Sequence, residues 1–168
     1  MHKRTKFFRG GFSLIELVIV VVIIGIIAAI AIPRMSRGSA GAADSALSGD
    51  MAVWRSALDL YQTEHGGAYP TDNTTIIAQL TTYTDASGNT NPTRDSTHTF
   101  GPYLRQVPPL PVGGSSEKGQ ATIGSTAPGG PPASVAAGGL GWLYDGAGSV
   151  YPNTGSLADA SGKAYNTY

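Results

Sequence analysis

The feature that most constrains this chain is an unbroken apolar run from Leu17 to Ile32, which Phe12-Ser13-Leu14-Ile15-Glu16 precedes and Pro33 follows. As an α-helix, residues 12–32 would be about 31 Å long, which matches a hydrocarbon core of about 30 Å. Val and Ile dominate the run, and a helix satisfies their backbone groups in lipid, where each unpaired group costs several kcal/mol. The sequence therefore predicts a membrane-spanning helix at residues 12–33.

The charge distribution predicts the orientation of this helix. Lys3, Arg4, Lys6 and Arg9 precede the apolar run with no acidic residue among them, whereas the chain from Phe12 onward has 7 basic and 11 acidic residues, a net charge of −4. Because basic flanks stay in the cytoplasm, we expect the N-terminal residues there and the later residues across the membrane. A nucleic-acid-binding protein would carry its positive charge on the folded part, so nucleic acid is not an expected partner.

The residues alone leave three interpretations of the N-terminal segment open. A secretory signal peptide would explain the basic start and the small-x-small pattern of Ala29-Ile30-Ala31, although the apolar run exceeds the usual length of about 7–15 residues. A plain single-pass anchor is the second interpretation, with Glu16 at headgroup level and without a partner. In the third, a neighbouring chain supplies a positive partner, because a carboxylate at the bilayer centre costs about 2.5–3.5 kcal/mol, and less near the interface.

The segment Arg9-Gly10-Gly11-Phe12-Ser13-Leu14-Ile15-Glu16-Leu17 resembles the prepilin signature of type IV pilins and type II secretion pseudopilins. The resemblance implies that residues 1–11 form a cytoplasmic leader peptide. A prepilin peptidase would cleave after Gly11 and methylate the amine of the new N-terminal residue, Phe12. The resemblance also implies that Glu16 neutralises the N-terminal ammonium of an adjacent subunit during filament assembly, which supplies the positive partner.

Residues 34–65 are predicted to form an amphipathic helix. Apolar residues recur at intervals of four and three positions and predict one buried face: Leu47, Met51, Trp54, Leu58 and Tyr61. His65-Gly66-Gly67 is expected to end the helix, because Gly readily adopts the left-handed conformation of a C-cap. We expect a kink or local break at Pro33, which lacks a backbone N–H, and a weakly held, exposed link at residues 36–46.

Residues 66–168 are predicted to form a loop-rich globular head. Asp72 or Thr74 is expected to cap a short helix through residues 76–80. Residues 141–145 and 149–152 flank a Gly-Ala-Gly turn and predict a β-hairpin.

A further short strand is expected at residues 121–123, and the tail from Asn153 is expected to be poorly ordered. The predicted fold class is α+β, with a long N-terminal helix, transmembrane in its first half, packed against a small antiparallel sheet. The resemblance implies the same pilin-like fold.

A second resemblance concerns the helix end and the loop after it. Residues 54–71 are similar to the helix end of the major pseudopilin of type II secretion, where Tyr, an acidic residue, Gly and Tyr-Pro recur in that order. Gly101-Pro102-Tyr103-Leu104, followed by prolines, resembles the helix-to-sheet loop of that family. The chain has no cysteine and cannot form the disulfide that closes a C-terminal loop in many type IV pilins. This difference favours a pseudopilin.

These resemblances imply a structural subunit of a type II secretion pseudopilus, which supports protein export across the outer membrane. The subunit would cross the bacterial inner membrane once, with its head in the periplasm. Its expected partners are other pseudopilins, the prepilin peptidase and the inner-membrane assembly platform. The alternative function is that of a type IV pilin or minor pilin in adhesion, motility or surface binding.

No metal or other cofactor is expected. The major pseudopilin usually holds calcium in an acid-rich C-terminal loop, but only Asp145 and Asp159 follow Glu117 here. Asp85-Ala86-Ser87-Gly88-Asn89 carries one charge, so ordinary turns are the favoured interpretation of these loops. The histidines have neither metal-ligand spacing nor a suggestive triad, and an enzyme is not expected; they are His2, His65 and His98.

Overall fold

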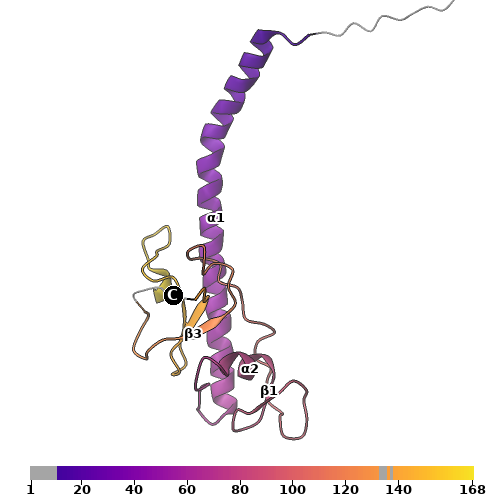
Figure 1. Cartoon of the computed structure of the whole chain (residues 1–168), viewed down its shortest axis with the longest axis vertical. Helices are drawn as coiled ribbons and strands as arrows, with labels where there is room; N and C mark the ends of the chain where they lie inside the picture. Colours follow the sequence, from indigo (N-terminus) through magenta and orange to yellow (C-terminus); the bar gives the residue numbers. More distant parts are fainter. Residues whose placement is uncertain (1–10, 133–135, 137) are drawn as a thin grey trace, which may run out of the picture. The chain divides into compact units, whose positions relative to one another are not determined.

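A computed structural model describes residues 11–132, 136 and 138–168 (Figure 1). Most of the predicted leader, residues 1–10, lies outside the described residues. The chain divides into two compact units, an N-terminal unit that ends at Ser39 and a head unit, Ala40–Tyr168. The elements in chain order are α1 (Leu14–Glu64), α2 (Ile76–Thr81), β1 (Tyr83–Thr84), β2 (Thr90–Asn91), β3 (Ile123–Ser125), β4 (Trp142–Tyr144), β5 (Val150–Pro152) and the 3₁₀-helix η1 (Tyr165–Thr167).

Helix α1 is continuous over a longer stretch than the sequence predicts. It continues through Pro33, so the predicted local break is absent. Proline removes only one backbone donor from a helix, and the hydrogen bonds of the flanking turns remain. Residues 36–46 also lie within α1, as part of the helix predicted at residues 34–65, and most of the described side chains of this stretch are exposed, as expected.

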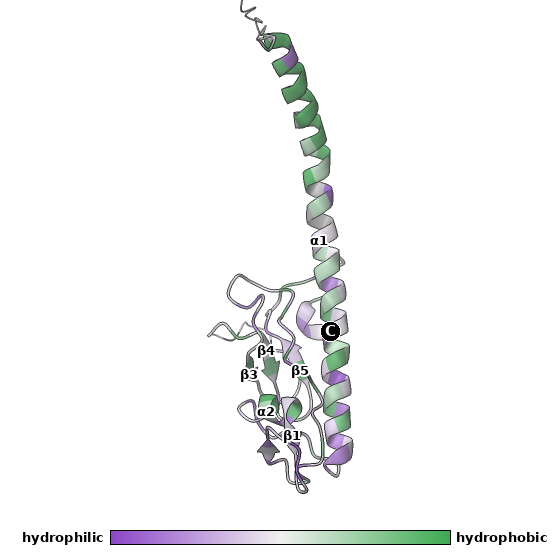
Figure 2. Cartoon of the chain, turned by 90° about the vertical axis from the view of Figure 1, so that its right-hand side faces the viewer, coloured by the Kyte–Doolittle hydropathy of each residue, from purple (hydrophilic) through white to green (hydrophobic). Residues whose placement is uncertain are grey.

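The predicted apolar face of the helix forms the core of the head. All five stripe residues are between 0 and 4% exposed, and they pack with residues of α2 and of the β3-β4-β5 sheet in one cluster. Trp54 contacts Trp142 of β4 edge to face, with ring centroids 5.9 Å apart. The head is thus a helix covered on one face by a small sheet and long loops (Figure 2).

The main sheet has the order β3-β4-β5. Strands β4 and β5 pair antiparallel with Trp142 opposite Pro152, which confirms the predicted hairpin. Strand β3 runs parallel to β4, so the sheet is mixed, and the connection between them has the length that a parallel pair requires. A second, two-stranded antiparallel sheet pairs β1 with β2. The α+β class predicted from the sequence is confirmed.

The predicted C-terminal end of α1 is confirmed, whereas the N-cap residue of α2 is Thr75, which makes no side-chain capping bond, and Asp72 closes the turn before it. Gly66 and Gly67 have φ values of 66° and 91°, and the Gly67 N–H donates to the carbonyl of Gln62 at 2.8 Å, which forms a Schellman C-cap. At the start of α2, Asp72 Oδ1 accepts the backbone N–H groups of Thr74 and Thr75 at 2.8 and 3.0 Å.

The C-terminal segment packs onto the head, so the expectation of a poorly ordered tail was wrong. Asn153 is fully buried, and its Nδ2 donates to the Leu140 carbonyl at 2.9 Å. The Tyr165 hydroxyl donates to Asp44 of α1 at 2.7 Å, and the Arg55 guanidinium donates to the Tyr168 carbonyl. The segment is small and polar in composition, but the Tyr165 side chain attaches it to the helix and the Asn153 amide attaches it to the loop before β4.

Candidate functional site

The peptide bond between Gly11 and Phe12 lies in non-helical backbone just before α1. The Phe12 side chain is 83% exposed, and a Cβ placed on Gly11 would meet no atom within 4 Å. The helix begins two residues after Phe12, at Leu14. The predicted cleavage site is therefore open and irregular in structure, and a peptidase could reach it without unwinding a helix.

Glu16 lies in the first turn of α1 and accepts a hydrogen bond from the backbone N–H of Ser13, with Oε2 at 3.0 Å. Ser13 occupies the N-cap region, because its carbonyl accepts the N–H of Leu17 at 3.2 Å. A carboxylate in this position is also favoured by the positive end of the helix dipole. The structure thus places Glu16 at the same helix end as Phe12, four residues away in sequence.

The N-terminal part of α1 is long and apolar enough to cross a membrane. The candidate span is Leu14–Ile32, with 19 residues, a mean hydropathy of 3.2 and no buried residues. Its valines and isoleucines are each about half exposed or more, and most of these turns have the hydrophobic colour in Figure 2. Glu16 is the only charged residue within the span. Such a surface requires lipid or other apolar helices around it.

The acidic loops considered for calcium are turns built by their own aspartates. In three loops of the head, an aspartate Oδ1 accepts the backbone N–H groups two and four residues later, at 2.7–3.0 Å. A glycine with positive φ stands at the third following position in each. The three aspartates are Asp85, Asp145 and Asp159. They share the sequence pattern Asp-x-(Ser/Ala)-Gly-x, and the sequence analysis did not recognise this pattern as a turn that occurs three times.

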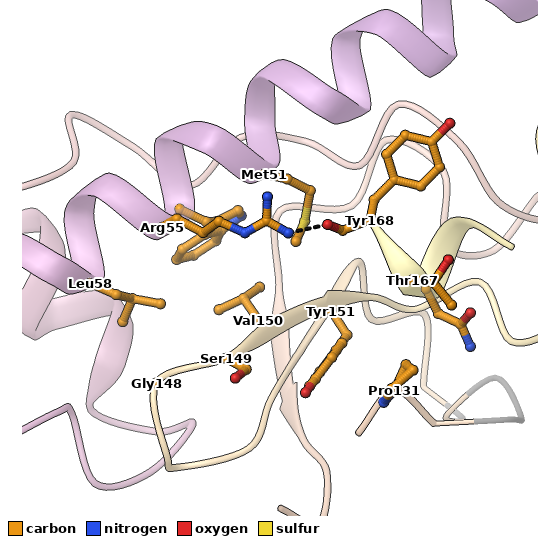
Figure 3. A pocket seen from close by; sticks show the side chains of 12 residues that line it. Met51, Arg55, Leu58, Pro131, Gly148, Ser149, Val150, Tyr151, Thr167 and Tyr168 are labelled. Carbon is orange, nitrogen blue, oxygen red and sulfur yellow. Dashed lines mark hydrogen bonds between the residues drawn. The ribbon is translucent and has the colours of Figure 1, made fainter. Parts of the chain in front are cut away.

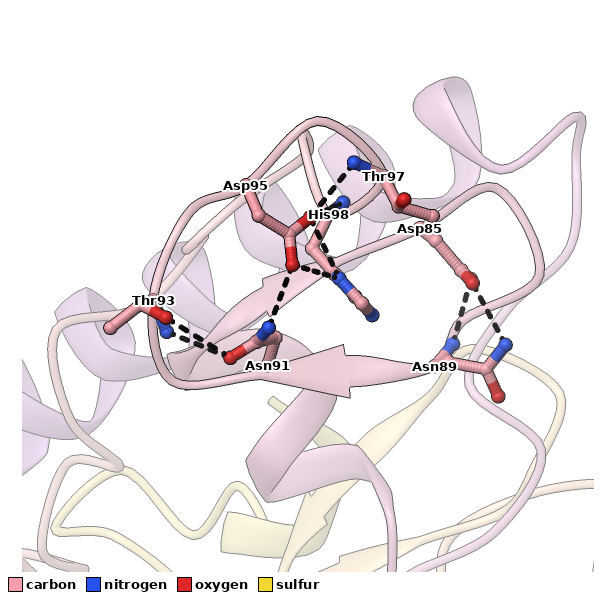
Figure 4. Close-up of polar contacts among 7 residues, drawn as sticks. All are labelled: Asp85, Asn89, Asn91, Thr93, Asp95, Thr97 and His98. Atoms are coloured by element: carbon pink, nitrogen blue, oxygen red, sulfur yellow. Dashed lines mark hydrogen bonds and ion pairs between the residues drawn. The ribbon is translucent and has the colours of Figure 1, made fainter.

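Within the described ranges, no group of three or more His, Cys, Asp or Glu side chains could hold a metal ion. His98 instead forms an ion pair with Asp95 at 3.0 Å (Figure 4). Backbone N–H groups of His98 and Thr97 donate to Asp95 and, with the His98 side chain, lower the pKa of its carboxyl to about 2. These contacts stabilise the loop after β2. Among the residues drawn in Figure 4, none completes a catalytic triad with His98 and Asp95.

His65 is a buried residue of the helix end. Its Nδ1 lies 2.8 Å from the carbonyl oxygen of Tyr61, and its ring stacks on the Tyr61 ring with centroids 3.8 Å apart. Next to it, the Tyr103 hydroxyl donates to Glu64 at 2.5 Å. His65 therefore packs at the end of α1, whereas His98 bonds to Asp95 in the loop after β2. Each histidine has a local structural role.

Residues 7–32 match the family model of the prokaryotic N-terminal methylation motif. No curated protein and no solved structure matches the chain. The matched residues include Gly11, Phe12, Glu16 and the whole apolar run. Together with the exposed apolar helix, the motif match fits membrane anchoring and prepilin-type processing. The motif and the α+β fold together support a type IV pilin-like protein.

Proposed function

We propose that this chain is a structural subunit of a type II secretion pseudopilus. The prepilin peptidase cleaves after Gly11 and methylates the amine of Phe12, and the processed subunits polymerise through the first half of α1. The observation that carries this proposal is the methylation motif on an apolar span, Leu14–Ile32, that has no buried residue and whose sole charge is Glu16. The role is structural rather than catalytic.

Assembly is driven by apolar burial between helices. Side chains in the span Leu14–Ile32 are exposed. Transfer of their surface from an apolar environment into water would cost about 25 cal/mol of free energy per Å² of apolar area. Packing against the helices of neighbouring subunits replaces lipid contacts with protein contacts, so a subunit can leave the bilayer without exposing this surface. The inner-membrane assembly platform would deliver subunits to the growing end.

Glu16 sets the register between subunits. In the uncleaved chain its carboxylate accepts the Ser13 N–H, a contact that holds it at the helix start. Cleavage creates an ammonium group on Phe12, and in a filament the ammonium of one subunit pairs with Glu16 of the next. Because both charges would lie in an apolar environment, an unpaired Glu16 would oppose assembly strongly.

The choice of a pseudopilus over a surface pilus is supported by the chain's lack of cysteine. The similarity of residues 54–71 and 101–104 to the major pseudopilin supports the same choice. The alternative function, that of a type IV pilin or minor pilin, predicts a different phenotype when the protein is deleted. If the chain is a pseudopilin, we expect its deletion to leave exported proteins in the periplasm, and if it is a pilin, we expect its deletion to remove surface fibres, adhesion or motility.

The test of the assembly role is the variant Glu16→Gln, with Glu117→Gln in a head loop as the matched control. We expect both variants to be processed normally, because the carboxylate is not part of the scissile bond. Only Glu16→Gln should fail to form filaments in sheared fractions and electron micrographs. Filaments of normal number and length in Glu16→Gln would contradict the charge-pair role.

A further inference from the structure

Residues 157–168 form a compact arm at the end of the head. Its backbone hydrogen bonds are mostly internal, because the Tyr165 N–H donates to the Leu157 carbonyl at 2.8 Å and Asp159 closes a turn of its own. Among the backbone hydrogen bonds of the described residues, only that from the Leu157 N–H to the Thr154 carbonyl joins the arm to the rest of the head. Side-chain contacts therefore hold the arm in place.

Within the described residues, two hydrogen bonds attach the arm to α1. The Tyr165 hydroxyl donates to Asp44 Oδ1 at 2.7 Å, and the Arg55 guanidinium donates to the Tyr168 carbonyl, as the dashed line in Figure 3 marks. Both tyrosine rings pack against the core of the head. Beside the Arg55 contact, a hollow of about 420 Å³ opens between α1, β5 and the arm, so packing is incomplete there. Because the contact with Asp44 is partly buried and that of Arg55 is exposed, we expect the first to contribute more to the attachment.

The turns of α1 at residues 40–46, where the arm attaches, have few other tertiary contacts. Only Ala43 and Asp44 are partly buried in this stretch, and the other five side chains are exposed. Gly41 lies in open space, and glycine is less favourable than alanine inside a helix. The Ser45 hydroxyl donates to the Gly41 carbonyl at 2.9 Å, a kind of contact that weakens a helix slightly. Segments with few buried contacts open at low free energy, so these turns depend on the contact that the arm supplies.

We propose that the arm is a clasp that keeps α1 helical at residues 40–46 through the hydrogen bond between Tyr165 and Asp44. Burial, and then the hydrogen bond to Asp44, raise the pKa of the Tyr165 hydroxyl to about 12, so the hydroxyl is protonated and donates at neutral pH. When the arm detaches, Asp44 loses this partner, and the turns around it retain little besides their own backbone hydrogen bonds. These turns directly follow the boundary between the two compact units, so the clasp controls whether α1 is continuous there.

Hydrogen exchange of the full chain in lipid nanodiscs, followed by mass spectrometry of its peptides, tests the clasp. The variant Tyr165→Phe keeps the ring and removes the donor. We expect amide exchange to be about fivefold faster at residues 40–47 and at residues 157–168, which is the effect of one lost hydrogen bond, and unchanged at β4. The matched control is Tyr83→Phe, which removes a hydroxyl that bonds to no other described residue and should change neither segment.

A second variant, Gly41→Ala, separates the effect on the helix from the effect on the arm. Added to Tyr165→Phe, it should slow exchange at residues 40–47 by about fivefold, because alanine favours the helix, and should leave exchange at residues 157–168 fast. Exchange at residues 40–47 that is unchanged in Tyr165→Phe, or that rises only together with exchange at β4, would overturn the proposal. Failure of Gly41→Ala to slow exchange at residues 40–47 would also overturn it, because the segment would then not be opening from a helix.

Discussion

Single carboxylates organise the loops of the head. Asp85, Asp145 and Asp159 each accept two backbone N–H groups of their own turns, and Asp72 does the same before α2. Side-chain and backbone hydrogen bonds to the ionised form lower the pKa of Asp72, Asp85 and Asp159. The stability of the head is therefore linked to pH at its acidic residues.

Asp72→Asn tests this linkage. The Thr74 hydroxyl, and then the backbone N–H groups of Thr74 and Thr75, lower the pKa of Asp72 from 3.8 to about 2. A carboxyl with a lowered folded-state pKa stabilises the fold above about pH 4 and loses that contribution as the pH falls through about 2. We expect the unfolding midpoint of the variant to lie below that of the unmodified chain above pH 4. The difference should shrink towards pH 2 in urea titrations followed by near-ultraviolet circular dichroism.

The matched control is Asp59→Asn, which removes an exposed charge from α1 without removing a capping interaction. A difference between the Asp72 variant and the unmodified chain that stays constant from pH 6 to pH 2 would show that its hydrogen bonds do not depend on ionisation.

Residue-level prediction succeeded where a side chain has a local partner and failed where its partner is distant. The position of Asp72 before an apolar segment predicts local hydrogen bonds to its own backbone, and the structure has them in the turn before α2, although the N-cap residue is Thr75. The contacts of Asp44 with Tyr165 and of Arg55 with Tyr168 join residues more than 100 positions apart. No local pattern encodes such pairs, so the sequence did not predict these two contacts.

At the scale of elements, two sequence features define α1: the spacing of its apolar residues and the glycines at its C-terminal end. The buried stripe and the terminal glycines could be predicted from the sequence, because both follow from helix geometry alone. Strands β1 and β2 have two residues each, too few for alternation to be recognised. The parallel pairing of β3 with β4 depends on the path of a long connection, and strand composition does not determine it.

Two glycine substitutions, one inside α1 and one in its C-cap, test this account of the helix with opposite expected signs. Gly66→Ala places a side chain at φ +66° with no atom within 4 Å of the new Cβ, so the penalty is conformational, and we expect a loss of about 1 kcal/mol of unfolding free energy. Gly49→Ala lies inside the helix in open space and should gain about 0.5–1 kcal/mol.

Chemical unfolding of the detergent-solubilised monomer measures both changes under the same conditions. Destabilisation by Gly49→Ala, or no effect of Gly66→Ala, would contradict the assignment of a helix that continues through residue 49 and ends at a left-handed glycine.

At the scale of the whole molecule, the two compact units differ in the environment that they need. The head unit, Ala40–Tyr168, encloses its own core of stripe, sheet and α2 residues. The described part of the N-terminal unit has no buried core, and its helix exposes most of its apolar side chains. From the length and hydropathy of the span, the sequence predicted a membrane-spanning first half of the helix and a second half that packs under the head.

A fragment of residues 40–168 should therefore be soluble, monomeric and cooperatively folded without detergent. The full chain should need detergent or lipid. Sedimentation and near-ultraviolet circular dichroism of the two proteins check this expectation. A fragment that aggregates or lacks a cooperative unfolding transition would show that the head depends on the N-terminal residues for its fold.

The most direct test of prepilin-type processing is mass spectrometry of the intact protein extracted from its native membrane. The account predicts an N-terminus at Phe12 that carries one additional methyl group. It also predicts loss of processing in Gly11→Val but not in the neighbouring control Gly10→Val. A mature protein that still begins at Met1, or one that begins after Ala31 as a cleaved signal peptide would leave it, would contradict the account.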